Sequence, residues 1–377
     1  MMESSVAVCI LGMHRSGTSA LTRLLNLLGV ELGNRLLEPS DDNPLGFWEQ
    51  KEIVECHGEL LPALNSYLDD FAPLPSGWEN FPQVQPFRER LIEIVQREFA
   101  ATPLWGFKDP RTCRLLPIWH SIFSQLGIQA RFVLMARDPA EIHGSLARRS
   151  GYSVNKSMLV TVEHMLRAER HTRGFPRVAV TFDQVLGDWR EAASRIGQAL
   201  QIQWPNAPDL IARQVDEFLN PRLRHHRVAT LPPADPDFVR WAEEATQAIC
   251  SGMNETKLDQ IAAEFEREKN RYLPWRPDWS VEQKLGEEIR WNQSERKLWT
   301  QNRIIEAESR AAMCEARRIE AEARAAAAES KTAKSEERSK EAENRAAQAE
   351  LRAAAAEAHA REGNGNSSRR AWLGRKK

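Results

Sequence analysis

The fold of this chain is decided by residues 12–19, which read Gly-Met-His-Arg-Ser-Gly-Thr-Ser. The apolar run 6–11 before this stretch predicts a short buried strand, and the leucines within 20–29 fall on one face of a helix. A glycine-bounded loop between a strand and a helix directs backbone N–H groups at an anion, and the helix dipole adds positive charge there. The stretch therefore predicts an anion-binding loop. The alternative is a plain turn whose hydroxyl side chains cap the helix.

The loop departs from the phosphate loop of ATPases at one residue. The pattern G-x-x-x-x-G-K-[ST] needs a lysine where this chain has Thr18, and the cation stands earlier, at Arg15. The best strand candidate ends in Arg137-Asp138, so no evident aspartate would hold magnesium. Both absences argue against transfer of a highly charged phosphoryl group. A sulfuryl group carries less charge, and backbone donors, hydroxyls and an arginine suffice to stabilise it.

With its early arginine, the loop resembles the 5′-phosphosulfate loop of sulfotransferases. These enzymes use 3′-phosphoadenosine 5′-phosphosulfate, abbreviated PAPS, as the sulfuryl donor. The resemblance implies that PAPS is the cofactor and that Arg15, Ser16, Gly17, Thr18 and Ser19 bind it. No metal is expected.

A second motif follows the strongest strand candidate, residues 131–136. Asp138 is placed to cap the next helix, Pro139 suits its first turn, and Ser145 lies eight residues beyond Arg137. Ligands of parallel sheets bind at the carboxyl ends of the strands, where Arg137 would lie beside the loop. The pair resembles the 3′-phosphate motif of sulfotransferases, and the alternative is a surface ion pair of Arg137. The resemblance spans roughly residues 6–200, including 180–186.

The bulk properties are those of an ordinary soluble protein. The chain has 377 residues and a formal net charge of −1, so nothing points to nucleic acid. Its five cysteines are scattered, which argues against a disulfide framework or zinc site and favours a reducing compartment. There is no secretory signal and no run of about 20 apolar residues that would span a membrane. The expected location is the cytoplasm.

Strand and helix patterns alternate over the first part of the chain. The strand candidates are 6–11, 104–107, 131–136 and 177–182. The helical patterns lie around 84–101, 114–126, 139–149, 157–173 and 184–200. Such alternation predicts a three-layer α/β/α domain with a central parallel sheet, and the resemblance implies the phosphate-loop-like fold of sulfotransferases.

Composition divides the chain into four parts. We expect the α/β domain over 1–275, and a boundary with the start of a docking helix over 276–305. The Ala/Glu/Arg-rich segment 306–361 predicts a long helix or weak coiled coil, because its large apolar residues form no heptad seam. Self-association through this helix is left open. Residues 362–377 predict a disordered basic tail, which offers a peripheral contact with an anionic surface or partner.

Lys108 is the best candidate for a catalytic cation. It follows a short strand, so it should reach the same sheet edge as the loop. The run Lys108-Asp109-Pro110 resembles one in tyrosylprotein sulfotransferases, which implies that Lys108 stabilises the transferring group. The alternative is a surface Lys–Asp pair ahead of a helix. Arg111 and Arg114 are candidates for binding an anionic acceptor.

Glu49 is the favoured general base. Aromatic residues beside a carboxyl can raise its pKa, and tyrosylprotein sulfotransferases keep a glutamate base at a similar place. His57, His14 and Asp109 are rivals, and Glu49 could instead be a helix-start carboxylate. Arg15 stays charged, so it can stabilise the leaving phosphate but cannot donate a proton to it.

These patterns lead to one main functional hypothesis. The chain is expected to move a sulfuryl group from PAPS to a hydroxyl acceptor. The similarity to Golgi-type and bacterial Arg-Ser-Gly-Thr loops favours a glycan or other carbohydrate. One alternative is an atypical phosphate-loop kinase or NTPase. Another is a non-catalytic nucleotide-binding scaffold whose helical tail binds partners.

Overall fold

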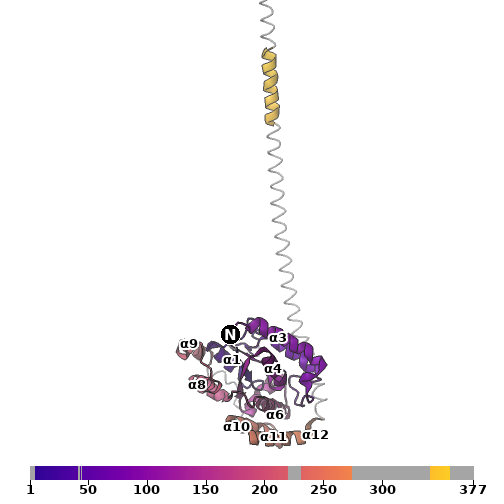
Figure 1. Ribbon diagram of the computed structural model, residues 1–377, viewed down its shortest axis with the longest axis vertical. Helices are drawn as coiled ribbons and strands as arrows, with labels where there is room; N and C mark the ends of the chain where they lie inside the picture. The colour runs from indigo at the N-terminus through magenta and orange to yellow at the C-terminus, as the bar shows by residue number, and fades with distance from the viewer. Residues whose placement is uncertain (1–4, 41–42, 44, 220–230, 274–339, 357–377) are drawn as a thin grey trace, which may run out of the picture. The chain divides into compact units, whose positions relative to one another are not determined.

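The computed structural model describes residues 5–40, 43, 45–219, 231–273 and 340–356. By its internal contacts the chain divides into two units, Met1–Trp279 and Ser280–Lys377. The described strands and helices of the first unit are numbered in chain order, with several of the helices labelled in Figure 1. They are β1 (Val6–Leu11), α1 (Thr18–Leu27), α2 (Lys51–Ala63), α3 (Gln85–Phe99), β2 (Leu104–Lys108), α4 (Thr112–Leu126), β3 (Gln129–Ala136), α5 (Pro139–Ser150), α6 (Val154–His171), β4 (Arg177–Thr181), α7 (Phe182–Gly187), α8 (Trp189–Leu200), α9 (Pro208–Phe218), α10 (Pro236–Cys250), α11 (Glu255–Arg267) and α12 (Lys269–Tyr272). Short 3₁₀ turns at Trp78–Asn80 and Pro82–Val84 precede α3.

The four strands form one parallel sheet in the order β2-β1-β3-β4. In the register of the sheet, Ile10 of β1 lies beside Lys108 of β2, and Leu11 lies beside Leu134 of β3. The chain runs from β1 to one side of the sheet and later crosses to β3 on the other. The carboxyl ends of β1 and β3 therefore flank a topological switch point, which is where ligands bind in open α/β sheets.

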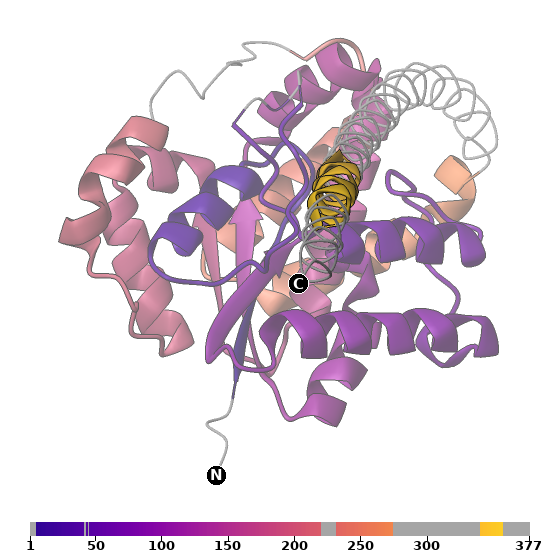
Figure 2. The same ribbon diagram turned by 90° about the horizontal axis from the view of Figure 1, so that it is seen from above.

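Helices cover both faces of the sheet, as the alternation of side chains requires. In β1, Cys9 and Leu11 enter the core beneath α2, α3, α4 and α6, whereas Val8 and Ile10 enter the core beneath α1, α8 and α9. Figure 2 shows the sheet with the pink α8 and α9 on one side and the violet α2 and α3 on the other. The expected three-layer α/β/α fold is confirmed.

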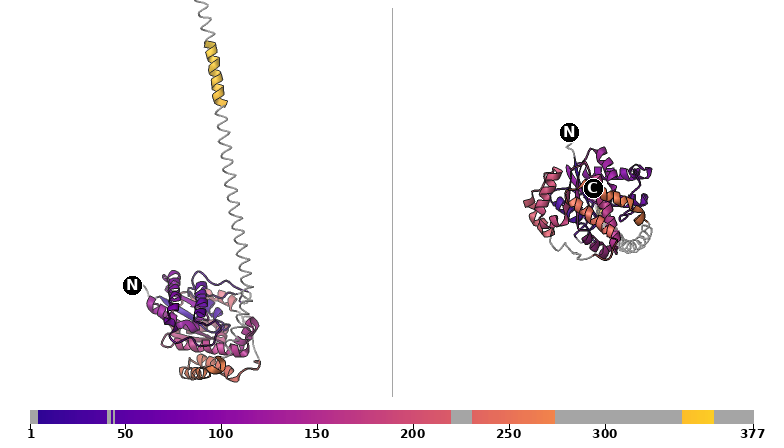
Figure 3. Two further views of the ribbon diagram at one scale, coloured as in Figure 1. Left: turned by 90° about the vertical axis from the view of Figure 1, so that its right-hand side faces the viewer. Right: turned by 90° about the horizontal axis from the view of Figure 1, so that it is seen from below.

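The orange helices α10 and α11 add an outer layer against α6, as the left view of Figure 3 shows. Phe238 and Trp241 of α10, Phe265 of α11 and Tyr272 of α12 are all buried and pack as one aromatic group. This group joins the core on the α6 side of the sheet, so the helices after residue 231 belong to the same folded unit.

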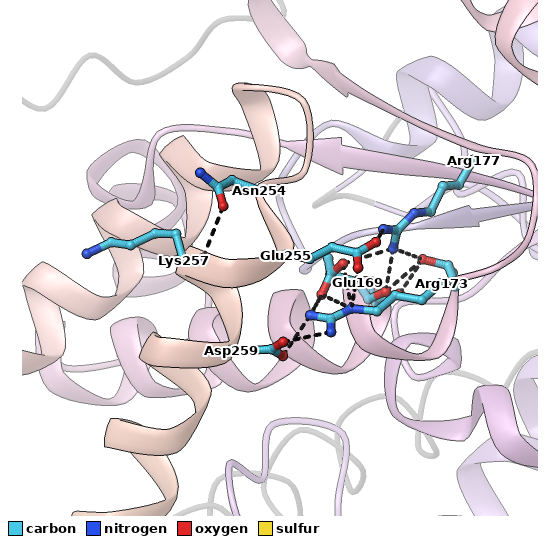
Figure 4. A network of polar contacts seen from close by, with 9 residues as sticks. Glu169, Arg173, Arg177, Asn254, Glu255, Lys257 and Asp259 are labelled. Atoms are coloured by element: carbon cyan, nitrogen blue, oxygen red, sulfur yellow. Dashed lines mark hydrogen bonds and ion pairs between the residues drawn. The ribbon is translucent and has the colours of Figure 1, made fainter.

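A polar network ties α6, β4 and α11 together at the amino end of the sheet (Figure 4). Glu169, 1% exposed, accepts bonds from Arg173 Nε at 3.0 Å and Arg177 Nη1 at 2.9 Å. Arg177 also contacts Glu255 at 2.6 Å, and Arg173 contacts Asp259 at 2.9 Å. Glu169, Arg173 and Arg177 therefore each have a partner of opposite charge.

The sequence expectations differ from the structure in two places. The expected helix 184–200 is two helices, because Asp188 leaves the helical conformation, ends α7 and caps α8 by accepting from Glu191 N–H. The helix α2 was not expected; it begins after Gln50, whose side chain accepts from Ile53 N–H. Within the described residues, no helix is both long and apolar enough to span a bilayer.

The second unit is described only over residues 340–356, which are helical and fully exposed (yellow in Figure 1). A single ion pair, Glu341 to Arg345 at 3.4 Å, links consecutive turns there. This piece lies inside the expected long helix 306–361. The structure does not describe the remainder of that long helix. The expected docking segment 276–305 and the expected basic tail 362–377 also lie outside the described residues.

Candidate functional site

The loop after β1 has a conformation that requires glycine at both ends. Gly17 has φ 96°, and a Cβ there would lie 2.3 Å from the ring of Phe182. A Cβ at Gly12 would lie 2.7 Å from the carbonyl oxygen of Met135. The loop thus passes close to β3 and to the start of α7, and a side chain at either glycine would push it away.

The amino end of α1 has no side-chain cap. Gly17 is the N-cap residue and no side chain caps the helix, so the hydroxyls of Ser16, Thr18 and Ser19 do not have the capping role that the plain-turn alternative gives them. The first N–H groups of a helix have no partner within the helix, and an anion satisfies them well. In the part of the chain that the structure describes, the fully buried Ser16 Oγ has no hydrogen-bond partner either.

The other residues of the loop are held in place. Arg15 has φ 65°, which is a strained backbone conformation for a residue other than glycine. Backbone strain of this kind is often found at ligand-binding and active sites. The Gly12 N–H donates to the sulfur of Cys113 at 3.2 Å. Burial raises the pKa of the Cys113 thiol to about 12, so this sulfur acts as a neutral hydrogen-bond acceptor and is no nucleophile at neutral pH.

The structure brings Arg137 and Ser145 to the loop, as their spacing predicts. Asp138 caps α5 through Ala140 N–H at 2.7 Å, which sets the helix that carries Ser145. Arg15 Nε donates to Ser145 Oγ at 2.8 Å, and Arg137 Nη1 donates to the Arg15 carbonyl at 2.9 Å. Arg15 thus forms one cluster at the β1/β3 switch point with Arg137 and Ser145, which lie 122 and 130 positions further along the chain.

The guanidinium of Arg137 is oriented by its neighbours. Nε donates to Glu141 at 2.9 Å, and the group lies over the ring of Phe182, 4.5 Å from its centroid. Its Nη2 is buried and, among the described residues, has no partner. Because an orphaned guanidinium donor is costly to bury, this atom and Ser16 Oγ fit a doubly phosphorylated nucleotide at the loop.

Lys108 and Glu49 form a buried ion pair at the adjoining strand end. Lys108 Nζ lies 2.5 Å from Glu49 Oε1 and 3.2 Å from Ser19 Oγ in the loop. Lys108 is the last residue of β2, and Glu49 precedes the N-cap of α2. The structure therefore places both candidate catalytic residues against the anion-binding loop, and Lys108 is not the surface residue of the alternative interpretation.

Burial changes the acid–base behaviour of Glu49. Desolvation raises its pKa, and the attraction of Lys108 opposes that shift without cancelling it. The preceding residue, Trp48, has φ 58°, and its ring lies beneath the guanidinium of Arg23 at 4.3 Å. Among the described non-glycine residues with positive φ, Arg15 and Trp48 are the two that lie beside the candidate site rather than at a helix end.

Two of the three rival bases, His57 and Asp109, are committed to other contacts, whereas His14 keeps a ring nitrogen without a partner in the described structure. His57 is fully buried: its Nδ1 contacts Asp109 at 2.8 Å, and its Nε2 accepts from Trp119 Nε1–H at 2.9 Å. Burial alone would raise the pKa of Asp109, but Arg111 and His57 outweigh it and hold that pKa below its usual value. Both rivals therefore lack a free basic atom, and they hold the end of β2 to α2.

The arginines considered for acceptor binding have structural contacts. Arg111 donates from its backbone N–H and its Nη1 to Asp109. Arg114 is buried and donates to the carbonyl oxygens of Tyr67 and Ala72 at 3.0 and 2.6 Å. Arg114 thereby holds the loop between α2 and α3, which sequence patterns do not reveal.

Sequence reasoning missed two contributors to this region. His164 of α6 lies edge-on to His14 of the loop, with ring centroids 5.9 Å apart. Asp69, in the loop held by Arg114, is buried with one oxygen unpartnered in the described structure. The one signal for His164 in the sequence is its place in α6 directly before Met165 and Leu166, on a helix that also carries charged residues. No local pattern marks Asp69.

Comparisons with known proteins give only distant matches. No protein-family model matches the sequence, and no curated protein matches it. The sulfotransferase domain of the Synechococcus PCC 7002 olefin synthase is 18% identical, with 64% of this chain and 94% of that chain covered and a TM-score of 0.37. Sulfotransferase STF1 of Mycobacterium tuberculosis H37Rv is 14% identical, with coverages of 64% and 76% and a TM-score of 0.36. A retinol dehydratase in complex with androsterone and inactive cofactor PAP is 13% identical, with coverages of 67% and 80% and a TM-score of 0.30.

Proposed function

We propose that this chain is a sulfotransferase that moves a sulfuryl group from PAPS to a hydroxyl group. One observation carries the proposal: a single sheet edge unites an anion-binding loop, an Arg137/Ser145 cluster on one side of it and the Lys108–Glu49 pair on the other. A nucleotide with phosphates at both its 5′ and 3′ positions needs two anion sites, and the sulfuryl group needs a cation and a base nearby.

The cofactor would be held by residues of the loop and of α5. The backbone and hydroxyls of residues 16–19 would bind the 5′-phosphosulfate, and Arg137 and Ser145 would bind the 3′-phosphate. The unpartnered Ser16 Oγ and Arg137 Nη2 supply one donor to each end. Arg15 contacts Ser145, so its charge would act between the two ends.

When bound, PAPS supplies the sulfuryl group: the acceptor oxygen bonds to sulfur as the bond from sulfur to the 5′-phosphate oxygen breaks. Glu49 takes the proton of the acceptor hydroxyl, and its raised pKa makes it a stronger base than an exposed glutamate. Lys108 Nζ stabilises negative charge on the sulfuryl and leaving-group oxygens, while Ser19 holds the ammonium against the loop.

The acceptor is proposed to be a glycan or another carbohydrate, on the resemblance of the Arg-Ser-Gly-Thr loop. We place the reaction in the cytoplasm. The described cysteines, Cys9, Cys56, Cys113 and Cys250, are free thiols, which suits a reducing compartment. The kinase or NTPase alternative lacks the loop lysine, and the scaffold alternative gives no reason to bury a lysine and a glutamate against the loop.

Isotope transfer tests this function. The full chain is incubated with ³⁵S-labelled PAPS and methyl β-D-galactopyranoside in EDTA, and in parallel with γ-³²P-labelled ATP and magnesium. Release of 3′-phosphoadenosine 5′-phosphate (PAP) and labelled glycoside, without magnesium, is expected. ATP turnover that requires magnesium, with PAPS left intact, would establish the NTPase instead. Tight PAP binding without any turnover would favour the scaffold.

A further inference from the structure

Three buried polar atoms have no partner in the described structure: His14 Nε2, His164 Nε2 and Asp69 Oδ1. We call them the acceptor row. We propose that they bind the acceptor molecule and select an uncharged polyol, whose several hydroxyls form hydrogen bonds with them. This inference rests on the proposed sulfuryl transfer and adds the residues that choose its acceptor.

His164 is a hydrogen-bond acceptor in this arrangement. The side chain is fully buried, and its Nδ1 lies 2.9 Å from the Val160 carbonyl oxygen. A carbonyl oxygen only accepts, so Nδ1 carries the proton and Nε2 presents a lone pair. Within the described part of the chain this Nε2 has no partner. Burial lowers the pKa of His164 to about 4, so the ring is neutral at physiological pH.

His14 extends the row to the anion-binding loop. Its ring lies edge-on to that of His164, with the centroids 5.9 Å apart. Its Nε2 is buried and, among the residues described, unpartnered. Burial, reinforced by His164, lowers the pKa of His14 well below the usual value, so this ring is neutral too. His14 belongs to the loop that Lys108 contacts through Ser19 Oγ at 3.2 Å, which ties this end of the acceptor row to the Lys108–Glu49 pair.

Asp69 forms the far end of the row. It is 2% exposed, and its Oδ2 accepts from Tyr152 Oη and Lys156 Nζ, each at 2.5 Å. Its Oδ1 is buried without a partner in the described structure. Its partner Lys156 belongs to α6, so Asp69 contacts the same helix that carries His164. Because Arg114 pins the loop that carries Asp69, the carboxylate is presented rigidly.

The chemistry of this row defines its ligand. His164 Nε2 and Asp69 Oδ1 need donors, and a hydroxyl can pair with His14 Nε2 whichever tautomer that neutral ring adopts. An unsatisfied buried polar atom is costly. A sugar or similar polyol provides donor hydroxyls along its length beside the one that reacts. An apolar phenol would leave the row unpaired, and a site built for hydrogen bonds rejects such an analogue strongly. An anionic sugar would be repelled by the carboxylate of Asp69.

Acceptor kinetics with three probes test the inference. We measure PAP release from PAPS with methyl β-D-galactopyranoside, its charged relative methyl β-D-glucuronide, and p-nitrophenol. The neutral glycoside is expected to give the highest kcat/KM. Asp69→Asn and His164→Leu should each raise its KM about 10-fold or more, the loss of one buried hydrogen bond to a charged or desolvated group. His164→Gln should recover part of the loss, because the amide oxygen can replace Nε2.

Matched measurements separate this inference from the proposed function. His120→Gln, at a half-buried histidine that stacks on Phe175, is the control and should leave KM unchanged. PAP affinity should be equal in all variants. Asp69→Asn should also lower the melting temperature, because it weakens the buried ion pair with Lys156. A wild-type protein that does not bind PAP overturns the proposed function. PAP binding with no response to the glycoside, a preference for either other probe, or KM values unmoved by the substitutions overturns the acceptor row alone.

Discussion

Two polar clusters, one at each end of the parallel sheet, differ in how their buried groups are paired. At the amino end, both carboxylate oxygens of Glu169 are bonded to Arg173 or Arg177 (Figure 4). At the carboxyl end, Ser16 Oγ and Arg137 Nη2 are buried without partners in the described structure. Buried polar groups that only hold a fold find partners within the chain. The difference therefore separates a structural network from a site prepared for a ligand.

Backbone strain follows the same division. Arg15 and Trp48 adopt positive φ at the carboxyl edge, next to the loop and to Glu49. At the amino end, Arg173 and Arg177 lie in or beside regular elements and have ordinary backbone angles. Strain persists only where the surrounding structure imposes it, and it gathers at functional sites. Substitutions at the two ends should therefore affect different properties of the protein.

The largest effect is expected at the amino end, on stability alone. Glu169→Gln removes the charge that two arginines share, and breaking such a buried pair costs about 3 kcal/mol of unfolding free energy. This value is at the lower end of the usual range, because Arg177 keeps its ion pair with Glu255 and Arg173 keeps its ion pair with Asp259. Denaturant titration measures the loss.

A matched control sharpens this prediction. Glu217→Gln breaks an exposed pair with Arg213 and should change the unfolding free energy by less than about 0.5 kcal/mol. PAP affinity should stay unchanged in both variants. A loss of PAP affinity in folded Glu169→Gln would show that the amino-end network is not merely structural.

The next effect is expected at the carboxyl edge, on turnover. Glu49→Gln and Lys108→Ala should each lower kcat about 100-fold or more and leave PAP affinity nearly intact, since both act in the transition state. Single-turnover kinetics and PAP titration give the two quantities. Near-normal turnover of Glu49→Gln would move the base to another group.

The pH dependence of the same variants follows from the pKa of Glu49. Glu49 must be ionised to accept a proton, and burial raises its pKa. The acidic limb of kcat/KM should therefore lie above the ordinary glutamate range and vanish in Glu49→Gln. Because Lys108 lowers the pKa of Glu49, the residual activity of Lys108→Ala should have its limb at still higher pH. A shift to lower pH would contradict the pairing.

The smallest effect is expected from the second unit. Residues 340–356 form an exposed helix, and a helix without an apolar face contributes little to the stability of a folded unit. Deleting residues 306–377 should therefore leave the melting temperature and PAP affinity unchanged. We propose that the tail is a tether for a partner that delivers the acceptor, so that delivery would be lost with it. A large fall in melting temperature would show instead that the tail stabilises the first unit.

Much of this fold could be predicted from local sequence. Apolar runs and helix signals such as Asp138-Pro139 identify β1, β3 and α5, because periodicity and capping depend on residues that are close together in the sequence. The spacing of Arg137 and Ser145 also predicted their meeting with the loop, since parallel strands end at one sheet edge. The break at Asp188 was missed because one residue interrupts an otherwise continuous helical pattern.

The rest depended on contacts between distant segments. His57 looked like a base until its ring proved to be held by Asp109 and Trp119, which are 52 and 62 residues away. Tertiary contacts alone bring Asp69 and His164 to the proposed site. Arg114 holds the segment that carries Asp69, and α6 brings His164 beside His14. Partners at such separations carry no local signature, so hydrogen-bond satisfaction was visible only in the structure.

The most direct test of the central claim is the affinity for a 3′-phosphate. Calorimetry of the full chain in EDTA compares PAP with adenosine 5′-phosphate, for the wild type and for Arg137→Ala. The wild type should bind PAP far more tightly, and Arg137→Ala should lose about 2–4 kcal/mol of PAP binding, the value of a charge-assisted pair, with little change for adenosine 5′-phosphate. Equal wild-type affinities for the two nucleotides would contradict the assignment of the carboxyl edge as a PAPS site.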